Sequence, residues 1–331
     1  MKSTFFIFLL ASGLICSAAV ADESRQGSFA EYLEGLKREA AEQHGMRQES
    51  LATIFPQIKQ FRLAKSQDED VPESTVAGSL ELYLPDTLSD ALVSEARFQY
   101  QGHNETLNRI GELYGVQPRF IVALWGLESR FGRPSAAYPV LSVTASQAYK
   151  GKQEAFFKEQ FFAALQILDS SSWQVDDLLA GVDGRMGQPR MLPEYYLDFA
   201  KDGDDDGKAD IWTNPSDVFA SIASFLKKSG WREDETWGRQ VKIPADFDES
   251  LAGGIKRGFA EWQALGVRRF DGSDLPARND MQVSMVMPDG PKGRVYLVYD
   301  NYLALKKWRD DDYFALALVH LSDRIKFQLG E

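Results

Sequence analysis

Apolar residues recur at helical spacing in several separate stretches of this chain. In residues 28 to 63, Phe29, Leu33 and Leu36 share one face of a predicted helix, and a second, shorter helix ends at Pro56. The same spacing predicts further helices over residues 92 to 114, 118 to 130, 155 to 168, 215 to 229 and 313 to 327.

The pattern changes in the last third of the chain. Apolar and polar residues alternate at 283 to 286 and at 294 to 298, which predicts short strands. Residues 65 to 76 are polar and charged, which predicts a loop or linker. The sequence holds no internal repeat and no low-complexity tract. We therefore expect a mainly α (α+β) fold, largely helical with a minor sheet.

The helix predicted over residues 118 to 130 carries a carboxylate at the end of an apolar stripe. Pro118 suits the first turn, where a missing N–H is no loss. Ile121, Trp125 and Glu128 share one side of this helix because they are three and four residues apart. A lone glutamate on such a helix is usually salt-bridged or half-exposed, so the spacing alone does not establish a catalytic role.

The first 21 residues have the build of a secretory signal. Lys2 gives a positive start, an apolar run follows, and a small-residue cleavage site ends at Ala21. The apolar run is shorter than the ~20 residues that a spanning helix needs, and the residues before Cys16 match a lipid-attachment pattern poorly. We expect a cleaved signal peptide over residues 1 to 21 and a soluble, exported, periplasmic protein.

Composition excludes several classes of site. Cys16 is the only cysteine and lies in the predicted signal, which excludes disulfides, thiolate metal sites and a cysteine nucleophile in the mature chain. The three histidines are far apart, which argues against a histidine-rich zinc site or a Ser-His-Asp triad. Asp and Glu outnumber Lys and Arg by 49 to 37, and no basic stripe occurs, so we expect no nucleic acid partner. Without coiled-coil heptads, we expect a monomer.

The residues around Glu128 resemble the catalytic helix of a known family. Residues 121 to 132 read IVALWGLESRFG, which is similar to the motif of the B-type lytic murein transglycosylases, where the glutamate is the catalytic acid/base. The resemblance continues through GRMGQPRMLP at 184 to 193 and DGDDDGKADIW at 202 to 212. It covers the chain from about residue 29 to residue 325, in the order of the family.

This resemblance implies a lysozyme-like helical catalytic core. We expect an N-terminal helical segment and linker over residues 22 to 88, the core with its acidic loop over 89 to 236, and a small mixed α/β subdomain with the C-terminal helix over 237 to 331. The implied reaction cleaves the bond between N-acetylmuramic acid and N-acetylglucosamine in peptidoglycan. Glu128 donates a proton, the N-acetyl group assists, and Glu128 then deprotonates the 6-hydroxyl to give a 1,6-anhydromuramoyl end. This chemistry needs no cofactor.

The resemblance also assigns residues to the substrate groove. Ser129 would hydrogen-bond groups in the cleft, although an ordinary helix serine is an alternative. The other residues implied to bind substrate are Met186, Gly187, Gln188, Arg190, Phe225, Trp308, Arg309, Tyr313 and Phe314.

Several groove positions depart from the family pattern, and the changes insert charges. Arg185 stands where alanine is usual, Arg190 where glutamine is usual, and Arg309 where asparagine is usual. Because a guanidinium suits carboxylates, one hypothesis is that Arg190 and Arg309 engage the lactyl or peptide carboxylates of a stem-bearing muropeptide. The other departures are Gly181 for serine, Glu194-Tyr195 for Ser-Ser, Ser224-Phe225 for Asn-Tyr and Asp311 for serine.

These departures leave two alternatives to lytic cleavage. The altered groove fits a non-catalytic murein-binding or scaffolding protein, and a lysozyme-type hydrolase is the alternative within the enzyme class. Retention of Glu128 with its whole surrounding helix favours an active enzyme over a binding protein.

An acidic loop repeats the spacing of a calcium loop. Asp202, Asp204 and Asp206 stand at alternate positions before a glycine, and Lys208 offers only its backbone carbonyl. The usual glutamate at the twelfth position is absent, and Asp217 further on supplies a closing ligand, as in the extended loop of the family. We expect a structural Ca²⁺ site, with a solvated acidic turn as the alternative.

Overall fold

The computed structural model describes residues 27–61, 78–135 and 137–329. The predicted signal over residues 1 to 21 and the predicted linker over 65 to 76 lie outside these residues. The described chain forms thirteen α-helices and two small sheets, which confirms the expected mainly helical fold. In this part of the chain, no helix is both long and apolar enough to cross a membrane.

The central helical body is built around α6 (Pro118–Ser129). Neighbouring helices pack against α6 from several sides, so its residues from Phe120 to Leu124 are fully buried. One predicted helix, over residues 92 to 114, is in fact two helices that meet at His103. The helices around α6 are α4 (Asp90–Gly102), α5 (Asn104–Tyr114), α10 (Pro215–Lys228) and α13 (Asp312–Leu329).

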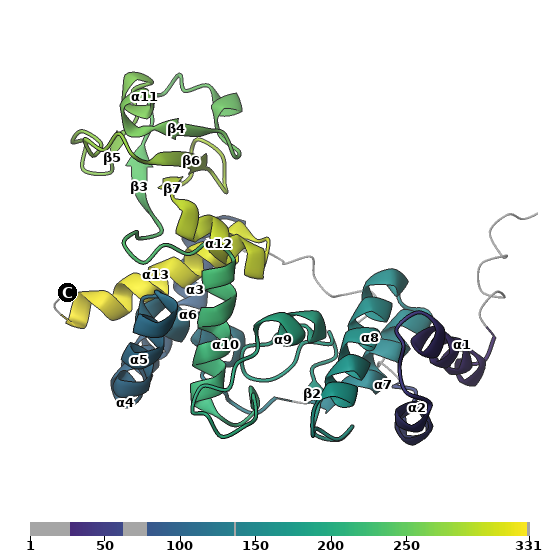
Figure 1. Cartoon of the computed structure of the whole chain (residues 1–331). Helices are drawn as coiled ribbons and strands as arrows, with labels where there is room; N and C mark the ends of the chain where they lie inside the picture. The colour runs from purple at the N-terminus through teal and green to yellow at the C-terminus, as the bar shows by residue number, and fades with distance from the viewer. Residues whose placement is uncertain (1–26, 62–77, 136, 330–331) are drawn as a thin grey trace, which may run out of the picture.

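A second group of helices extends from this body and carries the N-terminal segment (Figure 1). Here α7 packs against α8, α1 covers α7, and α9 joins α8 to α10. A short antiparallel pair, β1 (Tyr138–Pro139) with β2 (Leu179–Ala180), lies between the two groups. The helices are α1 (Phe29–Glu42), α2 (Gln48–Ile54), a 3₁₀ turn (Phe55–Gln57), α7 (Val140–Lys150), α8 (Glu154–Ser170) and α9 (Pro193–Phe199).

A five-stranded antiparallel sheet projects from the helical body, in the strand order β4-β6-β7-β3-β5 (Figure 1). It has a hydrophobic core of its own, centred on Trp262 from the short helix α11 (Phe259–Ala264). The two predicted strands are confirmed as β6 and β7. The strands are β3 (Gly238–Lys242), β4 (Lys256–Gly258), β5 (Arg268–Arg269), β6 (Gln282–Val286) and β7 (Val295–Val298).

After the sheet, the chain returns to the helical body through α12 (Asp300–Trp308). Asn301, fully buried at its start, donates to the carbonyls of Arg232 and Glu235 at 2.8 Å and accepts from the N–H of Arg232 at 2.7 Å. The last helix, α13, packs on α6 and on α3 (Leu80–Thr87). Residues at the end of α12 are thereby brought to the end of α6.

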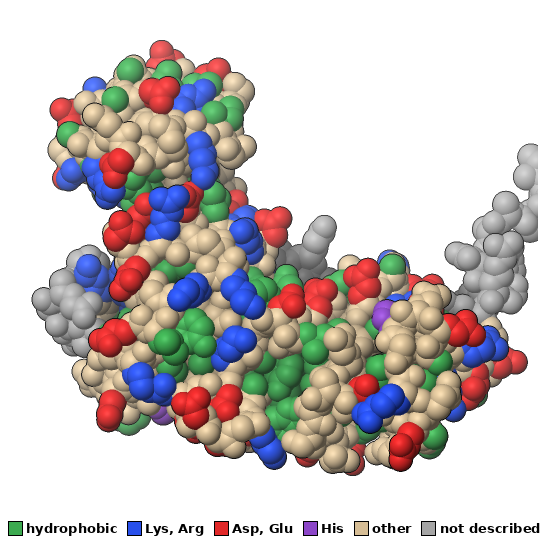
Figure 2. Space-filling model, viewed as in Figure 1, with side chains coloured by type: hydrophobic (Ala, Val, Ile, Leu, Met, Phe, Trp, Pro, Cys, Tyr) green, Lys and Arg blue, Asp and Glu red, His purple; other side chains and the backbone are tan. Residues whose placement is uncertain are grey.

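Acidic and basic side chains are intermixed over the face shown in Figure 2, with apolar side chains exposed between them. The formal net charge of −12 is therefore not gathered into one acidic patch on this face. An intermixed surface suits an uncharged or mixed-charge polymer better than a polyanion.

Candidate active site

Glu128 stands near the C-terminal end of α6, where the helix is stopped abruptly. Arg130 and Phe131 both adopt left-handed backbone conformations, with φ values of 50° and 61°. Ser129 closes this turn, because its hydroxyl donates to the Trp125 carbonyl at 3.2 Å and accepts from the Gly132 N–H at 2.9 Å. Ser129 therefore fixes the end of the helix, and in this structure its hydroxyl has local partners.

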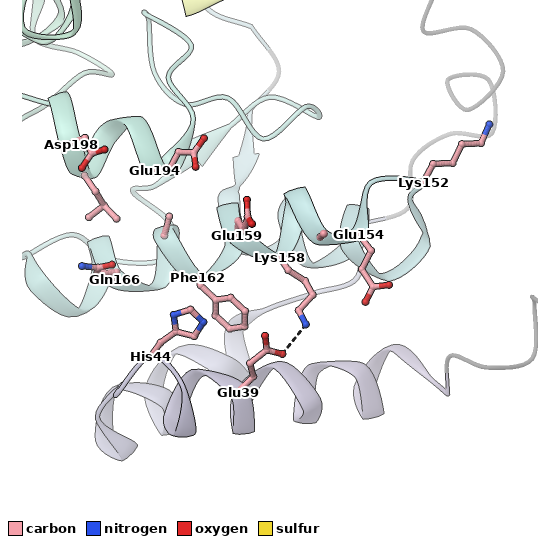
Figure 3. Close-up of a pocket in the computed structure, with 13 residues that line it drawn as sticks. Glu39, His44, Lys152, Glu154, Lys158, Glu159, Phe162, Gln166, Glu194 and Asp198 are labelled. Carbon is pink, nitrogen blue, oxygen red and sulfur yellow. Dashed lines mark hydrogen bonds and ion pairs between the residues drawn. The ribbon is translucent and has the colours of Figure 1, made fainter. Parts of the chain in front are cut away.

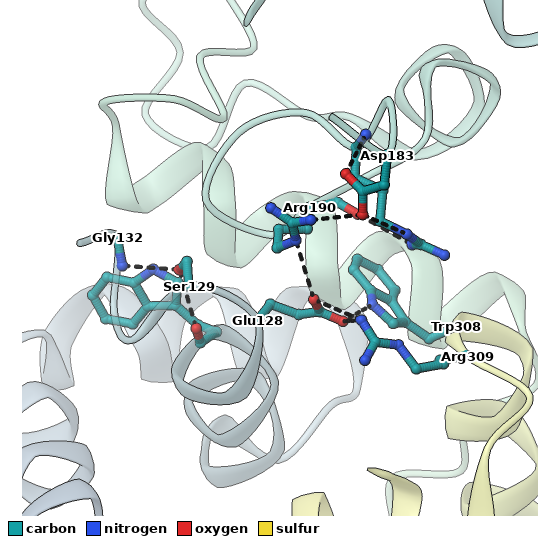
Figure 4. Close-up of polar contacts among 9 residues, drawn as sticks. Glu128, Ser129, Gly132, Asp183, Arg190, Trp308 and Arg309 are labelled. Atoms are coloured by element: carbon teal, nitrogen blue, oxygen red, sulfur yellow. Dashed lines mark hydrogen bonds and ion pairs between the residues drawn. The ribbon is translucent and has the colours of Figure 1, made fainter. Parts of the chain in front are cut away.

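The Glu128 carboxylate is buried, with 1% of its side chain exposed, and two hydrogen-bond donors and a further guanidinium surround it (Figure 4). The indole N–H of Trp308 donates to Oε1 at 3.0 Å. Nη2 of Arg309 lies 3.2 Å from both Oε1 and Oε2. Nε of Arg190 lies 3.9 Å from Oε2. Three of the predicted substrate residues thus meet at the predicted catalytic carboxylate.

Opposing effects act on the pKa of this carboxyl. Burial raises the pKa of Glu128 above its ordinary value, because desolvation disfavours the anion. The charge of Arg309, followed by that of Arg185, the Trp308 hydrogen bond and the charge of Arg190, lowers the pKa in part. The net direction is upward, which is the direction that a proton donor at neutral pH requires.

Arg185 and Arg190 share a second carboxylate that the sequence did not single out. Nη2 of Arg190 lies 2.6 Å from Oδ2 of Asp183, and Nε of Arg185 lies 3.8 Å from the same oxygen. A Cβ on Gly181 would lie 2.9 Å from Asp183 and 3.2 Å from Arg190. The departures at 181 and 190 are therefore coupled, since glycine leaves room for the ion pair. An acid two residues before Arg185 was the signal available in the sequence.

The loop that carries these arginines is fastened to α6 by Gln188. Its Oε1 accepts from the Trp125 indole at 2.8 Å, and its Nε2 donates to the Trp212 carbonyl at 2.9 Å. Met186, fully buried, exchanges two backbone hydrogen bonds with Met191. Gly187 has a φ of 64°, which places Gln188 against the helix. Met186 therefore supports the loop from within, whereas Gly187 and Gln188 line the adjacent cavity.

That cavity has a volume of about 400 Å³. Among the described residues that line it, Glu128 is the one carboxylate. Four arginines also line it, namely Arg130, Arg133, Arg185 and Arg190. The arrangement offers one buried acid beside a strongly basic wall.

Aromatic rings pack against the two residues that donate hydrogen bonds to the Glu128 carboxylate. The Phe225 and Trp308 rings are 4.8 Å apart, and each residue is 3% exposed. The Arg309 guanidinium lies 4.2 Å over the ring of Phe314. The Tyr313 hydroxyl is turned to Asp289. Phe225 and Phe314 thus hold the partners of Glu128 in place.

A larger cavity of about 900 Å³ lies between α1, α8 and α9 (Figure 3). His44 stacks on Phe162 at 4.1 Å, and Lys158 pairs with Glu39 at 2.8 Å. Its titratable side chains are partly or fully exposed, unlike Glu128. Acid/base chemistry is therefore better placed in the smaller cavity.

The acidic loop brings three of its predicted ligands together. Asp202, Asp204 and Asp217 each offer an oxygen within 4.8 Å of the others. Asp217 is fully buried, and its two oxygens accept from the N–H groups of Gly203 and Asp210 at 2.7 and 2.6 Å. Burial raises its pKa to about 6. The side chain of Asp206 is outside this group, and ligation by the backbone carbonyl of Lys208 stays a prediction.

Comparison with known proteins gives matches over nearly the whole described chain. The family described as Transglycosylase SLT domain matches residues 28–323. Membrane-bound lytic murein transglycosylase B of Escherichia coli (strain K12) is 24% identical over 293 residues, which are 85% of this chain and 79% of that protein.

Solved structures of lytic transglycosylases also match this chain. SltB3 from Pseudomonas aeruginosa, in complex with NAG-anhNAM-pentapeptide, matches with a TM-score of 0.82 and 30% identity, over 90% of this chain and 80% of that one. Its complex with NAG-NAM-pentapeptide matches with a TM-score of 0.83. Escherichia coli Slt35 in complex with calcium matches in fold, with a TM-score of 0.77 and 20% identity, over 94% of this chain and 99% of that one. The expected lysozyme-like core is thereby confirmed.

Proposed function

Since the chain belongs to the transglycosylase SLT domain family, and to its B-type lytic branch, we propose that it cleaves peptidoglycan between N-acetylmuramic acid and N-acetylglucosamine. The products carry 1,6-anhydromuramoyl ends, and Glu128 is the single acid and base. Structures of the relative SltB3 contain NAG-NAM-pentapeptide in one case and NAG-anhNAM-pentapeptide in the other.

The observation that carries this proposal is a single buried carboxylate in the cavity. Most glycosidases use two carboxyl groups, about 5–5.5 Å apart in retaining enzymes and about 6.5–9.5 Å apart in inverting ones. In the part of the cavity lining that the structure describes, Glu128 is the one carboxylate, and nearby Asp183 is bound to Arg190 at 2.6 Å. A site with one buried acid suits a reaction in which the substrate supplies its own nucleophile.

The proposed reaction balances with Glu128 alone. The protonated carboxyl gives its proton to the glycosidic oxygen as the bond to C1 breaks, and the carbonyl oxygen of the N-acetyl group bonds to C1. The Glu128 carboxylate then takes the proton of the 6-hydroxyl. O6 bonds to C1 as the bond from the acetyl oxygen breaks, which leaves the anhydro ring and the protonated acid. No water is consumed.

Digestion of purified sacculi tests this proposal by mass spectrometry of the released muropeptides. We expect ends that are lighter by one water than reducing ends. Reducing ends would instead identify a lysozyme-type hydrolase, and binding without release would identify a scaffolding protein.

Action on peptidoglycan places the protein in the periplasm or outside the cell, and we propose the periplasm, reached through the N-terminal signal.

We also propose that the acidic loop holds one calcium ion as a structural site. The donors of Asp202, Asp204 and Asp217 are carboxylate oxygens, the ligand type that Ca²⁺ prefers. Carboxylates this close repel one another without a cation, which supports the fit. The ion would hold the loop before α10 and take no part in the cleavage reaction.

Calcium is expected to raise the melting temperature of the purified protein. At a hundred times the dissociation constant the gain is about 2.7 kcal/mol, or roughly 5 °C for a chain of this size. Replacing Asp204 by Asn should abolish the rise. Replacing the neighbouring Asp205, which is outside the cluster, should leave it unchanged. Equal melts with calcium and with a chelator would refute the site.

A further inference from the structure

Arg309 is the most exposed of the three groups that contact Glu128. Its side chain is 37% exposed, compared with 27% for Arg190, and Trp308 is 3% exposed. It lies on one face of Phe314 and reaches both oxygens of the carboxylate. Arg309 is therefore the donor that can leave Glu128 with the least rearrangement.

Arg185 and Arg190 pair with a carboxylate other than Glu128, whereas Arg309 does not. Asp183 pairs with Arg190 at 2.6 Å and with Arg185 at 3.8 Å. Within the described residues, Glu128 is the one carboxylate within 4.0 Å of the Arg309 guanidinium. The charge of Arg309 is thus balanced by the acid that the reaction needs.

A bound substrate competes with these groups for the carboxylate oxygens. The leaving oxygen must come within about 2.6–3.2 Å of the acid. Oε1 already accepts hydrogen bonds from Trp308 and Arg309. Oε2 accepts one from Arg309 and lies 3.9 Å from Nε of Arg190. A guanidinium across both oxygens also stabilises the anion, which has no proton to donate. Because Trp308 is buried and Arg190 is held by Asp183, Arg309 is the donor that moves.

The Arg309 side chain is 37% exposed in the free protein, and a substrate that covers it removes water from the guanidinium. A second anion is then needed to balance its charge, because an uncompensated buried charge is costly. The muramic acid unit of the proposed substrate carries a lactyl carboxylate, and stem peptides carry carboxylates of their own. We infer, on the basis of the proposed function, that Arg309 determines specificity. It pairs with Glu128 in the free protein and with a carboxylate of the muramoyl substrate in the complex, so that an anionic substrate frees the acid.

Binding of matched saccharides tests this exchange. A GlcNAc-MurNAc disaccharide, which lacks the bond to be cleaved, is titrated by calorimetry with its lactyl carboxylate free or converted to a methylamide. A third ligand carries a stem peptide on the lactyl group, and a fourth carries the same peptide with its carboxylates amidated. We expect a preference of roughly tenfold or more for the free carboxylate within at least one pair. The pair that shows it identifies the lactyl or the peptide source.

The preference should vanish in the Arg309→Asn variant. The Arg278→Gln variant, which removes an exposed arginine paired with Asp280 in the sheet subdomain, should keep the wild-type ratio. The pH dependence of kcat/KM gives a second readout, because it reports the free enzyme, in which Arg309 pairs with Glu128. Removal of the Arg309 charge should move the alkaline limb of kcat/KM to higher pH. A wild-type protein without carboxylate preference, or a variant that keeps it, would overturn the inference.

Cleavage of the tetrasaccharide (GlcNAc-MurNAc)₂ and of its amidated and peptide-bearing forms separates this inference from the proposed function. If no form yields anhydro ends while the carboxylate preference persists, the proposed function fails and the assignment of Arg309 stands. If the acid and amide forms are cleaved at equal rates, the proposed function stands and the assignment of Arg309 fails.

Discussion

Replacing Glu128 by Gln is expected to lower the rate of glycan cleavage by roughly 10²–10⁴-fold, the usual contribution of a general acid. Glutamine has almost the same shape and can still accept hydrogen bonds from Trp308 and Arg309, so the cavity should keep its form. It carries no transferable acidic proton and takes none from the 6-hydroxyl. The measurement is the rate at which anhydro ends accumulate, followed by mass spectrometry.

The matched control is the Glu105→Gln variant, because Glu105 is exposed on α5. It should cleave at the wild-type rate, and both variants should have wild-type circular dichroism spectra. Persistence of anhydro product at the wild-type rate in the Glu128 variant would remove Glu128 from the reaction. The loss of activity in a folded variant is the outcome that supports a single acid and base.

The pH profile of the wild-type enzyme should reflect the burial of Glu128. A group that must be protonated to act is active below its pKa, and burial raises the pKa of this carboxyl. Activity should therefore persist to higher pH than an exposed glutamate would allow, and fall as the pH rises through the raised pKa. The alkaline limb of kcat/KM against pH measures this pKa, because kcat/KM reports the free enzyme.

The part of the site that lies on α6 could be predicted from the sequence. Pro118 at the first turn and the apolar stripe that ends at Glu128 are local features, and local periodicity is what a sequence pattern reports. The partners of Glu128 could be named only by resemblance. Trp308 and Arg309 follow it by 180 and 181 residues, and their contact depends on how α12 returns to the helical body.

The charge network was predicted in its parts but not in its arrangement. The sequence singled out Arg185, Arg190 and Arg309 as one group of departures from the family. The structure divides them, with Asp183 balancing the first two and Glu128 balancing the third. The pairing of Asp183 with Arg190 depends on how their loop folds and on the space that Gly181 leaves, which no periodicity encodes. In the acidic loop, the fold gathers three of the predicted ligands, Asp202, Asp204 and Asp217, whereas the side chain of Asp206 is outside that group.

Replacing Gly187 by Ala is expected to destabilise the protein by roughly 2–5 kcal/mol and to reduce cleavage. The φ of 64° at Gly187 costs an alanine about 1–2 kcal/mol. Its Cβ would also lie 2.6 Å from Cγ1 and 2.7 Å from the carbonyl oxygen of Ile211, an overlap that adds about 1–3 kcal/mol. Because the N–H of Gln188 donates to that same carbonyl at 2.9 Å, relief of the overlap shifts Gln188 away from α6.

Gly45 offers a matched control for this substitution. Its φ is 63°, and a Cβ there would meet no atom within 4 Å. Gly45→Ala should therefore lose only the backbone strain of about 1–2 kcal/mol and keep the wild-type rate of cleavage. Chemical denaturation followed by tryptophan fluorescence compares the two variants. If the Gly187→Ala and Gly45→Ala variants lost equal stability, the residues around Ile211 would have moved to make room for the methyl group. The loop would then not owe its position over Glu128 to the missing side chain at 187.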